Sequence, residues 1–124
     1  MNDSERAQRG NEMRMKLFGV APEPSENFKD IMDVTVEHLF GDIWTRDGLA
    51  LRDRSLITVA TLIALNREAQ LRVHLRGALN VGIGREEIKE MIIHLAHYAG
   101  WPAAMTAMKI ADEIFKERDG DEGG

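Results

Sequence analysis

Apolar side chains recur at intervals of three and four residues along most of the chain, which is the period of helices with one buried face. No segment shows the strict alternation that is typical of a strand. The pattern therefore predicts an all-α protein, folded as a single domain of about six helices. The expected helices cover residues 4–18, 25–40, 53–65, 67–81, 85–99 and 102–116.

Residues with strong local preferences mark the ends of these helices. The hydroxyls of Ser4 and Ser25 can each accept a hydrogen bond from a first-turn amide, as N-cap residues do. Glycine follows four of the predicted helices, at Gly19, Gly41, Gly82 and Gly100, and Gly82 is expected to end its helix in the left-handed conformation that glycine tolerates.

Two stretches lack the helical pattern. Residues 41–51 are expected to form the longest loop, because Gly41 and Gly48 permit backbone angles closed to other residues. Beyond Lys116 the sequence is polar and rich in glycine, which predicts a flexible tail. The expected organisation is an N-terminal helix and linker (1–24), a main helical domain (25–117) and the tail (118–124).

The apolar positions also predict which helix faces are buried. The third helix, residues 53–65, is apolar almost all round, which predicts a central helix enclosed on every side. The other helices carry a single stripe. These stripes are Phe28, Ile31, Met32, Thr35 and Leu39; Leu71, Leu75 and Ala78; Ile88, Met91, Ile92, Leu95 and Ala99; and Ala104, Ala107, Met108, Ala111, Ile114 and Phe115.

Composition narrows the class of function. The net charge of -5 comes from 16 basic and 21 acidic residues interspersed along the chain, which argues against a nucleic-acid partner. Cysteine is absent, which excludes disulfides, thiolate metal sites and thiol nucleophiles. The charged start lacks the apolar run of a signal peptide and no later segment resembles a membrane span, so the cytoplasm is expected. A chain of 124 residues buries a modest share of its surface, which favours self-association through exposed apolar faces.

His74 is the leading candidate for a catalytic residue. On a helical period it lies at the edge of the stripe that contains Leu71 and Leu75, so its ring should be partly buried yet able to reach a cleft. Such a placement shifts the pKa of a histidine and suits a proton donor or acceptor. The alternative is a core histidine that makes one backbone hydrogen bond.

A second polar group lies on the fifth helix. Spacings of four and three place Glu90, His94 and His97 on one side of it, an arrangement that can ligate zinc or another divalent ion. A solvated or subunit-contacting face explains the same pattern without a metal, and we prefer that interpretation. Tyr98 lies between this face and the apolar stripe, where it can either enter a pocket or pack at an interface.

Several motifs occur in an order that resembles the carboxymuconolactone decarboxylase family. They are GDIWTR at 41–46, RSLIT at 54–58, HLRGALNVG at 74–82 and YAGWPAA at 98–104. The resemblance extends over about residues 28–115. It implies a helical fold related to alkyl hydroperoxidase D, and a homohexamer, for example a trimer of dimers.

The resemblance also separates two branches of this fold. In the hydroperoxidase branch a CxxC pair precedes the histidine that matches His74, and here those positions are Arg67 and Gln70. The acidic residue of that branch's proton relay falls at or near Ser55. Thiol peroxidase chemistry is therefore excluded, and the decarboxylase branch is the better match.

The reaction implied by the resemblance is the decarboxylation of 4-carboxymuconolactone to the enol-lactone of 3-oxoadipate, a step of the β-ketoadipate pathway of protocatechuate breakdown. No cofactor is expected, because the electrons of the departing carboxylate can flow into the conjugated lactone as a dienolate. For a small anionic lactone, Arg46 and Arg54 are expected to orient carboxylates, with Ser55 nearby, while His74 protonates the dienolate or polarises the lactone carbonyl. Trp44 and Tyr98 are the other expected substrate contacts.

Each assignment has an alternative. Arg54 can be a surface arginine or part of an intersubunit ion pair, and Trp44 can fill the core. Two other functions also fit the sequence: a related lyase or isomerase that acts on another small unsaturated carboxylate or lactone, and a non-catalytic oligomeric binding protein of the same fold.

Overall fold

The computed structural model describes residues 3–123, with side chains over residues 4–120, and every regular element in this range is helical. The single all-α domain with six α-helices is thereby confirmed. The elements are α1 (Asp3–Phe18), the short 3₁₀ helix η1 (Glu26–Phe28), α2 (Lys29–Val34), the π-helix η2 (Thr35–Ile43), α3 (Leu51–Ala64), α4 (Glu68–Asn80), α5 (Arg85–Tyr98) and α6 (Trp101–Gly123).

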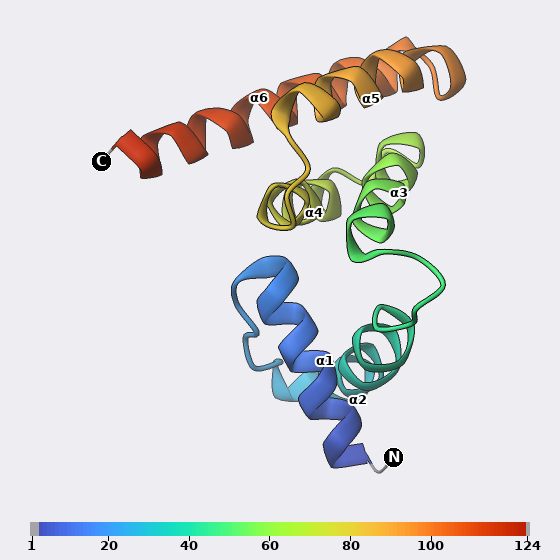
Figure 1. Ribbon diagram of the computed structural model, residues 1–124, viewed down its shortest axis with the longest axis vertical. Helices are drawn as coiled ribbons and strands as arrows, with labels where there is room; N and C mark the ends of the chain where they lie inside the picture. Colours follow the sequence, from blue (N-terminus) through green and yellow to red (C-terminus); the bar gives the residue numbers. More distant parts are fainter. Residues whose placement is uncertain (1–2, 124) are drawn as a thin grey trace.

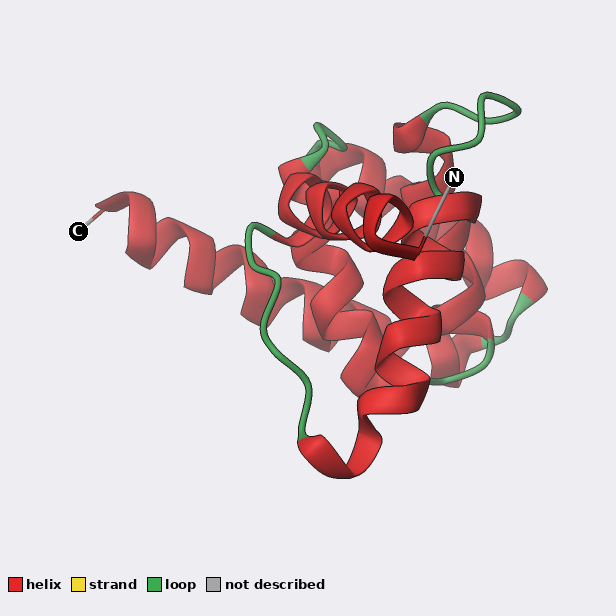
Figure 2. Ribbon diagram, turned by 90° about the horizontal axis from the view of Figure 1, so that it is seen from below, coloured by secondary structure: helices red, strands yellow, loops and turns green. Residues whose placement is uncertain are grey.

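The helices form three tiers along the long axis of the molecule (Figure 1). α1 packs against η2 at one end, α3 packs against α4 in the middle, and α5 and α6 form an antiparallel pair at the other end. The two chain ends lie at opposite ends of the molecule. The C-terminal part of α6 extends beyond the other helices (Figure 2). Within the described residues, no helix is long and apolar enough to cross a membrane.

Two hydrophobic clusters fill the interior. The larger one joins α3, α4, α5 and α6 and contains the predicted stripe of Leu71, Leu75 and Ala78, which is confirmed as buried. The smaller one joins α1 to η2 and to the residue after it, and consists of Met13, Leu17, Phe40 and Trp44. The N-terminal tier thus has a core of its own, next to α4.

The predicted helix ends are largely confirmed. Gly19, Gly82 and Gly100 all adopt left-handed φ angles, of 77°, 95° and 103°. Ser25 caps η1 by accepting a hydrogen bond from the amide of Asn27. Ser4 is not an N-cap, because α1 already begins at Asp3.

The loop predicted over residues 41–51 is wrong at both ends. η2 continues through Gly41 to Ile43, and α3 begins at Leu51, so only residues 44–50 lie outside helices. Neither Gly41 nor Gly48 has a left-handed φ angle. Gly41 is needed instead for close packing, since a Cβ there would lie 2.7 Å from the carbonyl oxygen of Arg6.

Several predicted buried faces are exposed. α3 is not enclosed on every side: Val59 and Ile63 are buried, whereas Ile57 is 52% exposed and Leu65, directly after the helix, is 58% exposed. The same correction applies to other members of the predicted stripes, namely Phe28, Ile31, Leu39 and Met108. The hydrophobic pattern identifies an apolar helix face, but it does not indicate whether another part of the same chain packs against that face.

α6 is longer than the sequence pattern predicts. It continues beyond Lys116 to Gly123, and ion pairs connect this extension to the body of the fold. Arg85 pairs with Asp119 at 2.7 Å and Arg76 pairs with Glu117 at 2.8 Å. The flexibility of residues 118–124 and the division of the chain at residues 24 and 117 stay predictions, and residues 1, 2 and 124 lie outside the described range.

Candidate active site

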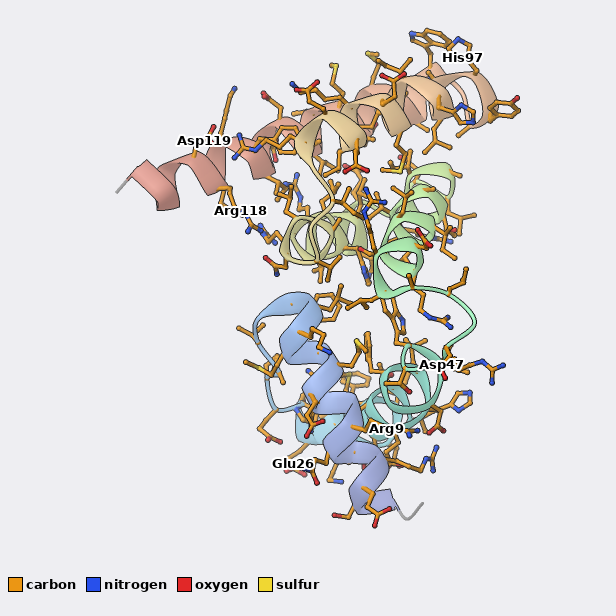
Figure 3. All side chains as sticks on the ribbon, in the orientation of Figure 1. Arg9, Glu26, Asp47, His97, Arg118 and Asp119 are labelled. Carbon is orange, nitrogen blue, oxygen red and sulfur yellow. The ribbon has the colours of Figure 1, made fainter. Side chains whose placement is uncertain are left out.

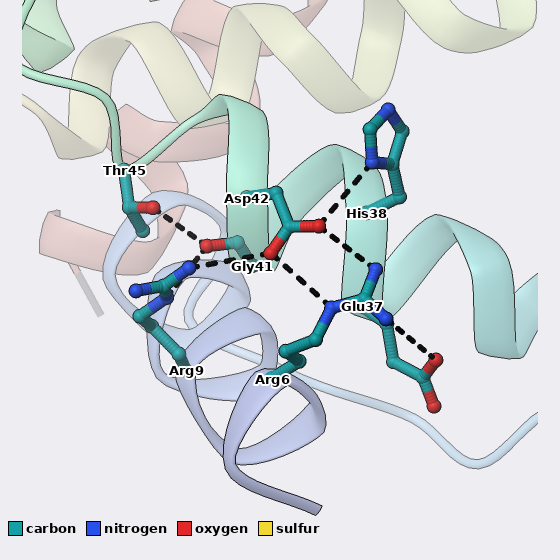
Figure 4. Close-up of polar contacts among 7 residues, drawn as sticks. All are labelled: Arg6, Arg9, Glu37, His38, Gly41, Asp42 and Thr45. Atoms are coloured by element: carbon teal, nitrogen blue, oxygen red, sulfur yellow. Dashed lines mark hydrogen bonds and ion pairs between the residues drawn. The ribbon is translucent and has the colours of Figure 1, made fainter. Parts of the chain in front are cut away.

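A charged cluster holds α1 against η2 (Figure 4). Arg6 Nη2 donates to Asp42 Oδ2 at 2.8 Å, and Arg9 Nε donates to the carbonyl of Gly41 at 2.7 Å. His38 Nδ1 lies 3.3 Å from the same carboxylate of Asp42. The hydrogen bond from Arg6 lowers the pKa of Asp42 below its usual value. Asp42, the second residue of the GDIWTR motif, thus anchors the N-terminal helix, a role that the sequence did not indicate.

The backbones of these two helices also approach closely. A Cβ on Gly10 of α1 would lie 1.9 Å from the carbonyl oxygen of Val36 in η2. No side chain fits there, so glycine permits the contact at this position. The charged cluster and the glycine contact together fix how α1 lies relative to η2 and to Trp44 beyond it.

The imidazole of His74 lies among aromatic rings. The Trp44 indole stacks on it, with ring centroids 6.2 Å apart and planes at 21°. The Phe18 ring meets it edge-on, at 5.3 Å and 75°. Phe40 completes the group, because its centroid lies 5.6 Å from that of Phe18 and 5.9 Å from that of Trp44. The structure therefore brings together two predicted site residues, His74 and Trp44.

Burial determines the charge state of His74. Its Nδ1 is buried and makes no hydrogen bond to any described residue. Burial lowers the pKa of His74 below its usual value near 6.5. The ring is then neutral at pH about 7, with one N–H donor and one acceptor nitrogen. This state suits a hydrogen-bond donor or a proton shuttle.

Two further predicted residues lie at the start of α3 with unpartnered polar atoms. Ser55 is fully buried and its Oγ makes no hydrogen bond to a described residue, and the same holds for Nε of Arg54. Arg54 Nη2 donates to the carbonyl of Arg46 at 3.1 Å. Arg46 is exposed and lies two residues beyond Trp44 in the chain, so this hydrogen bond connects the start of α3 to the segment that carries Trp44.

Unmade hydrogen bonds of this kind are uncommon in folded proteins. A buried polar group without a partner costs about 1–3 kcal/mol, and such groups are frequent at ligand-binding sites. Among the described residues, the buried side-chain nitrogen and oxygen atoms without a partner belong to Arg54, Ser55 and His74. All three were predicted from the sequence as site residues.

The fifth-helix residues lie elsewhere. Tyr98 is 80% exposed and stacks on His94 at 4.9 Å. Figure 3 places His97, the neighbour of Tyr98, at the α5–α6 end of the molecule, whereas Asp47, the neighbour of Arg46, lies beyond the α3–α4 tier, next to η2. Within one chain the structure therefore does not bring Tyr98 to the region of Arg46 and Trp44.

The possible metal site on this helix is not assembled. His97 Nδ1 lies 2.9 Å from the carbonyl of Ile93, and its ring meets Trp101 edge-on at 5.1 Å. Over the described part of the chain, no group of three or more His, Asp or Glu side chains could hold a metal ion. Glu90, His94 and His97 therefore do not form a metal-binding set in this structure.

Sequence reasoning missed Phe18, which contacts His74, and Phe40, which contacts Phe18 and Trp44. Phe18 was assigned only as the last residue of a helix. The apolar stripe predicted for residues 25–40 ended at Leu39, one residue before Phe40. Both are aromatic, and only four phenylalanines occur in the chain. Their rarity was the available signal, although it does not indicate which other rings they contact.

Comparison with known proteins gives a consistent result. The model of the carboxymuconolactone decarboxylase family matches residues 29–113. A 4-carboxymuconolactone decarboxylase of Acinetobacter baylyi is 40% identical over 123 residues, which cover 94% of this chain and 92% of the relative. A nitrosuccinic acid decarboxylase of Metarhizium robertsii is 33% identical over 85 residues, covering 68% of this chain and 59% of the relative.

Proposed function

The chain belongs to the carboxymuconolactone decarboxylase family, and we propose that it is a carboxy-lyase that converts 4-carboxymuconolactone to the enol-lactone of 3-oxoadipate in protocatechuate breakdown. The observation that carries this proposal is the 40% identity to a decarboxylase of that name over nearly the whole of both chains. The absence of cysteine excludes a thiol peroxidase mechanism.

The substrate itself supplies the electron sink. The bond between the γ carbon and its carboxylate breaks, carbon dioxide leaves, and the electron pair moves through the conjugated double bond to the lactone carbonyl. A proton added at the α carbon of this dienolate gives the enol-lactone. No separate electron-accepting cofactor is needed for this sequence of steps.

His74 is the proposed proton donor. Its lowered pKa keeps the ring neutral in the free protein, so an N–H can point at the lactone carbonyl or at the dienolate oxygen. A bound dianion favours the protonated ring, because opposite charges at short range raise the pKa of a histidine. The site can therefore become competent for protonation as the substrate enters.

The start of α3 is the proposed carboxylate-binding edge. Arg54 retains a free Nε, Ser55 retains a free hydroxyl, and the first-turn amides of α3 carry partial positive charge. Arg46, which is exposed, can complete the binding of a second carboxylate. A dianion matches this supply of cationic and hydroxyl donors better than a neutral lactone does.

Self-association is part of the proposal. A groove of about 830 Å³ between α5 and α6 is lined mainly by apolar side chains, among them Ile93, Trp101, Met105 and Met108, which are 46–56% exposed. An acidic monomer with such a face is expected to cover it with a second copy of itself. A homohexamer is the assembly that the family resemblance implies, and Tyr98 would then lie at or near a subunit contact.

One observation favours a second candidate function. The relative from Metarhizium robertsii is named for nitrosuccinic acid, which is also a carboxylic acid with an electron-withdrawing group. A carboxy-lyase of the same mechanism acting on another small activated carboxylate is therefore the alternative. A non-catalytic binding protein is the third candidate, and the two relatives named as decarboxylases favour a carboxy-lyase over it.

The purified protein, incubated with 4-carboxymuconolactone, should release carbon dioxide and shift the ultraviolet absorbance as the conjugated lactone is consumed. Replacing His74 with glutamine should reduce kcat by about 10²–10⁴-fold, the usual contribution of a positioned acid or base. His38→Gln is the matched control: His38 is 60% exposed, and Arg6 and Arg9 keep their bonds to Asp42 without it, so turnover should be unchanged.

A panel of other unsaturated carboxylates and lactones separates the candidate functions. Turnover of another member but not of 4-carboxymuconolactone would replace the proposed substrate. If the folded wild-type protein converts no compound of the panel, the non-catalytic binding protein is the remaining candidate function. Full activity of the His74→Gln variant would exclude His74 as the proton donor.

A further inference from the structure

Phe18 is the residue through which the N-terminal helix reaches the candidate active site. We propose that it is a positioning residue, whose ring holds the His74 imidazole in the orientation needed for proton transfer. The inference rests on the proposed decarboxylase function. It assigns a role to α1, which precedes the segment matched by the family model, residues 29–113.

The end of α1 is fixed directly on α4. Leu17 is fully buried, and a Cβ on Gly77 would lie 3.1 Å from its Cδ1, so side chain and helix backbone are in close contact. Asn80 Nδ2 donates to the carbonyl of Leu17 at 2.9 Å. These contacts involve α4 residues one and two turns beyond His74. They hold the backbone immediately before Phe18.

The chain turns away immediately after Phe18. Gly19 adopts a φ angle of 77°, and its amide donates to the carbonyl of Met15 at 2.9 Å, which closes the last turn of α1. Phe18 is therefore anchored on both sides, by Leu17 before it and by the Gly19 turn after it. Its half-buried ring has little freedom to move away from α4.

The ring of Phe18 supplies a constraint that no hydrogen bond provides. A catalytic histidine is commonly oriented by a hydrogen bond at the ring nitrogen that does not react. Nδ1 of His74 has no such partner among the described residues. The ring is held instead by the stacked indole of Trp44 and by the edge of Phe18, an arrangement that aromatic rings prefer.

Loss of either ring would release the imidazole. The second side-chain torsion of histidine has broad minima, so packing decides which direction the ring nitrogens face. The Trp44 indole keeps the imidazole from tilting out of the stacked arrangement. The Phe18 ring, which lies at 75° to the imidazole, blocks its rotation toward that side. Without Phe18, the nitrogen that should face the substrate can rotate out of reach.

The electrostatic surroundings agree with a packing role. Burial is the cause of the lowered pKa of His74, and no charged group contributes to the shift. The charged side chains on the elements that pack against α4 are therefore not what sets its protonation. These include Arg54 on α3, Arg14 and Lys16 on α1, and Glu113 and Glu117 on α6.

Steady-state kinetics with three variants test the proposal. Phe18→Leu keeps apolar volume but removes the flat ring, and it should lower kcat by about tenfold or more while KM changes by less than about threefold. Phe18→Tyr retains the ring and should keep kcat within about threefold of the wild type. Phe28→Leu, at a phenylalanine that is 65% exposed, is the control and should have no effect.

The second readout does not need catalysis. Each of the four histidines can be assigned by substitution, and NMR of the free protein then follows the imidazole signals of His74 through a pH titration. Phe18→Leu should shift these signals and raise the titration midpoint, whereas Phe28→Leu should not. The urea midpoint of each variant shows that it remains folded.

The outcomes separate the two proposals. Unchanged kcat and an unchanged His74 titration in a folded Phe18→Leu protein would overturn the positioning role. An equal loss in Phe18→Leu and Phe18→Tyr would also overturn it, because the ring would then not be the feature that matters. If the wild type fails to decarboxylate the lactone but Phe18→Leu still alters the His74 titration, the proposed substrate is refuted. The packing of His74 by Phe18 is then still established.

Discussion

His74 is a titratable side chain in an apolar environment. Its ring is stacked on Trp44, meets Phe18 edge-on and leaves Nδ1 unbonded, so burial acts on the imidazole without any compensating charge. A lowered histidine pKa has a consequence for stability as well as for catalysis. The folded protein binds the proton less readily than the unfolded chain does.

The wild type should lose stability relative to His74→Gln as the pH falls. Above the unfolded-state pKa of about 6.5, His74 is neutral in both states and has no effect on the pH dependence. As the pH falls below that value, the unfolded chain takes up a proton that the folded protein resists, until the folded pKa is reached. Urea unfolding at pH about 7.5 and about 5 would measure the difference. Parallel pH curves for the two proteins would contradict it.

The sequence predicted some residues of the site and missed others for a definite reason. Trp44 and His74 were chosen for their chemistry and their rings stack, and Arg54 and Ser55, also predicted, have buried polar atoms without a partner. Phe18 was missed because the hydrophobic pattern of α1 identifies only the apolar face of that helix. It does not indicate that the end of α1 packs against α4.

At the scale of helices, the position of α1 depends on close contact with η2. A methyl group at residue 10 would overlap the backbone of Val36, and backbone cannot move as the end of a flexible side chain can. Gly10→Ala should therefore separate the two helices and lower the free energy of unfolding by about 1–3 kcal/mol. Denaturant unfolding measures this loss directly.

Gly48→Ala is the matched control for this substitution. Gly48 has no left-handed φ angle, and a Cβ there would meet no atom within 4 Å. Its free energy of unfolding should be unchanged or slightly raised, since alanine restricts the unfolded chain. If Gly10→Ala were as stable as Gly48→Ala, the close contact would not be required for the fold.

Helix existence could be predicted from sequence, whereas some boundaries could not. Glycine is a weak helix former, which led to a predicted stop at Gly41. Tertiary contacts override that preference: Arg9 bonds to the carbonyl of Gly41, and Arg6 bonds to the next residue, Asp42. α6 likewise continues beyond the last residue of its apolar stripe, and the ion pair between Arg85 and Asp119 holds this extension.

At the scale of the whole molecule, the apolar groove between α5 and α6 is the face expected to meet a second copy. Met108 is 51% exposed at its wall, so Met108→Glu would place a charge where apolar surface is to be buried. The variant should have a smaller mass than the wild type in size-exclusion chromatography with light scattering. Its helical circular dichroism should be unchanged.

Val20→Glu is the control for that experiment. Val20 is apolar and 60% exposed, but it does not line the groove. Its mass should equal that of the wild type. A monomeric wild type would reject the proposed homohexamer, and a Met108→Glu protein of full size would show that the groove is not the contact.

η2 closes its turns with hydrogen bonds that span five residues, and the amide of Trp44 continues the series by donating to the carbonyl of Leu39 at 2.9 Å. Such wide turns accommodate one more residue than an α-helix does between the same two ends. Deleting one residue between Thr35 and Ile43 would let the segment become an ordinary α-helix and still deliver the indole to the imidazole. Loss of a codon is therefore tolerated in this segment during evolution, whereas the same loss within α4 before His74 would turn the imidazole by about 100°.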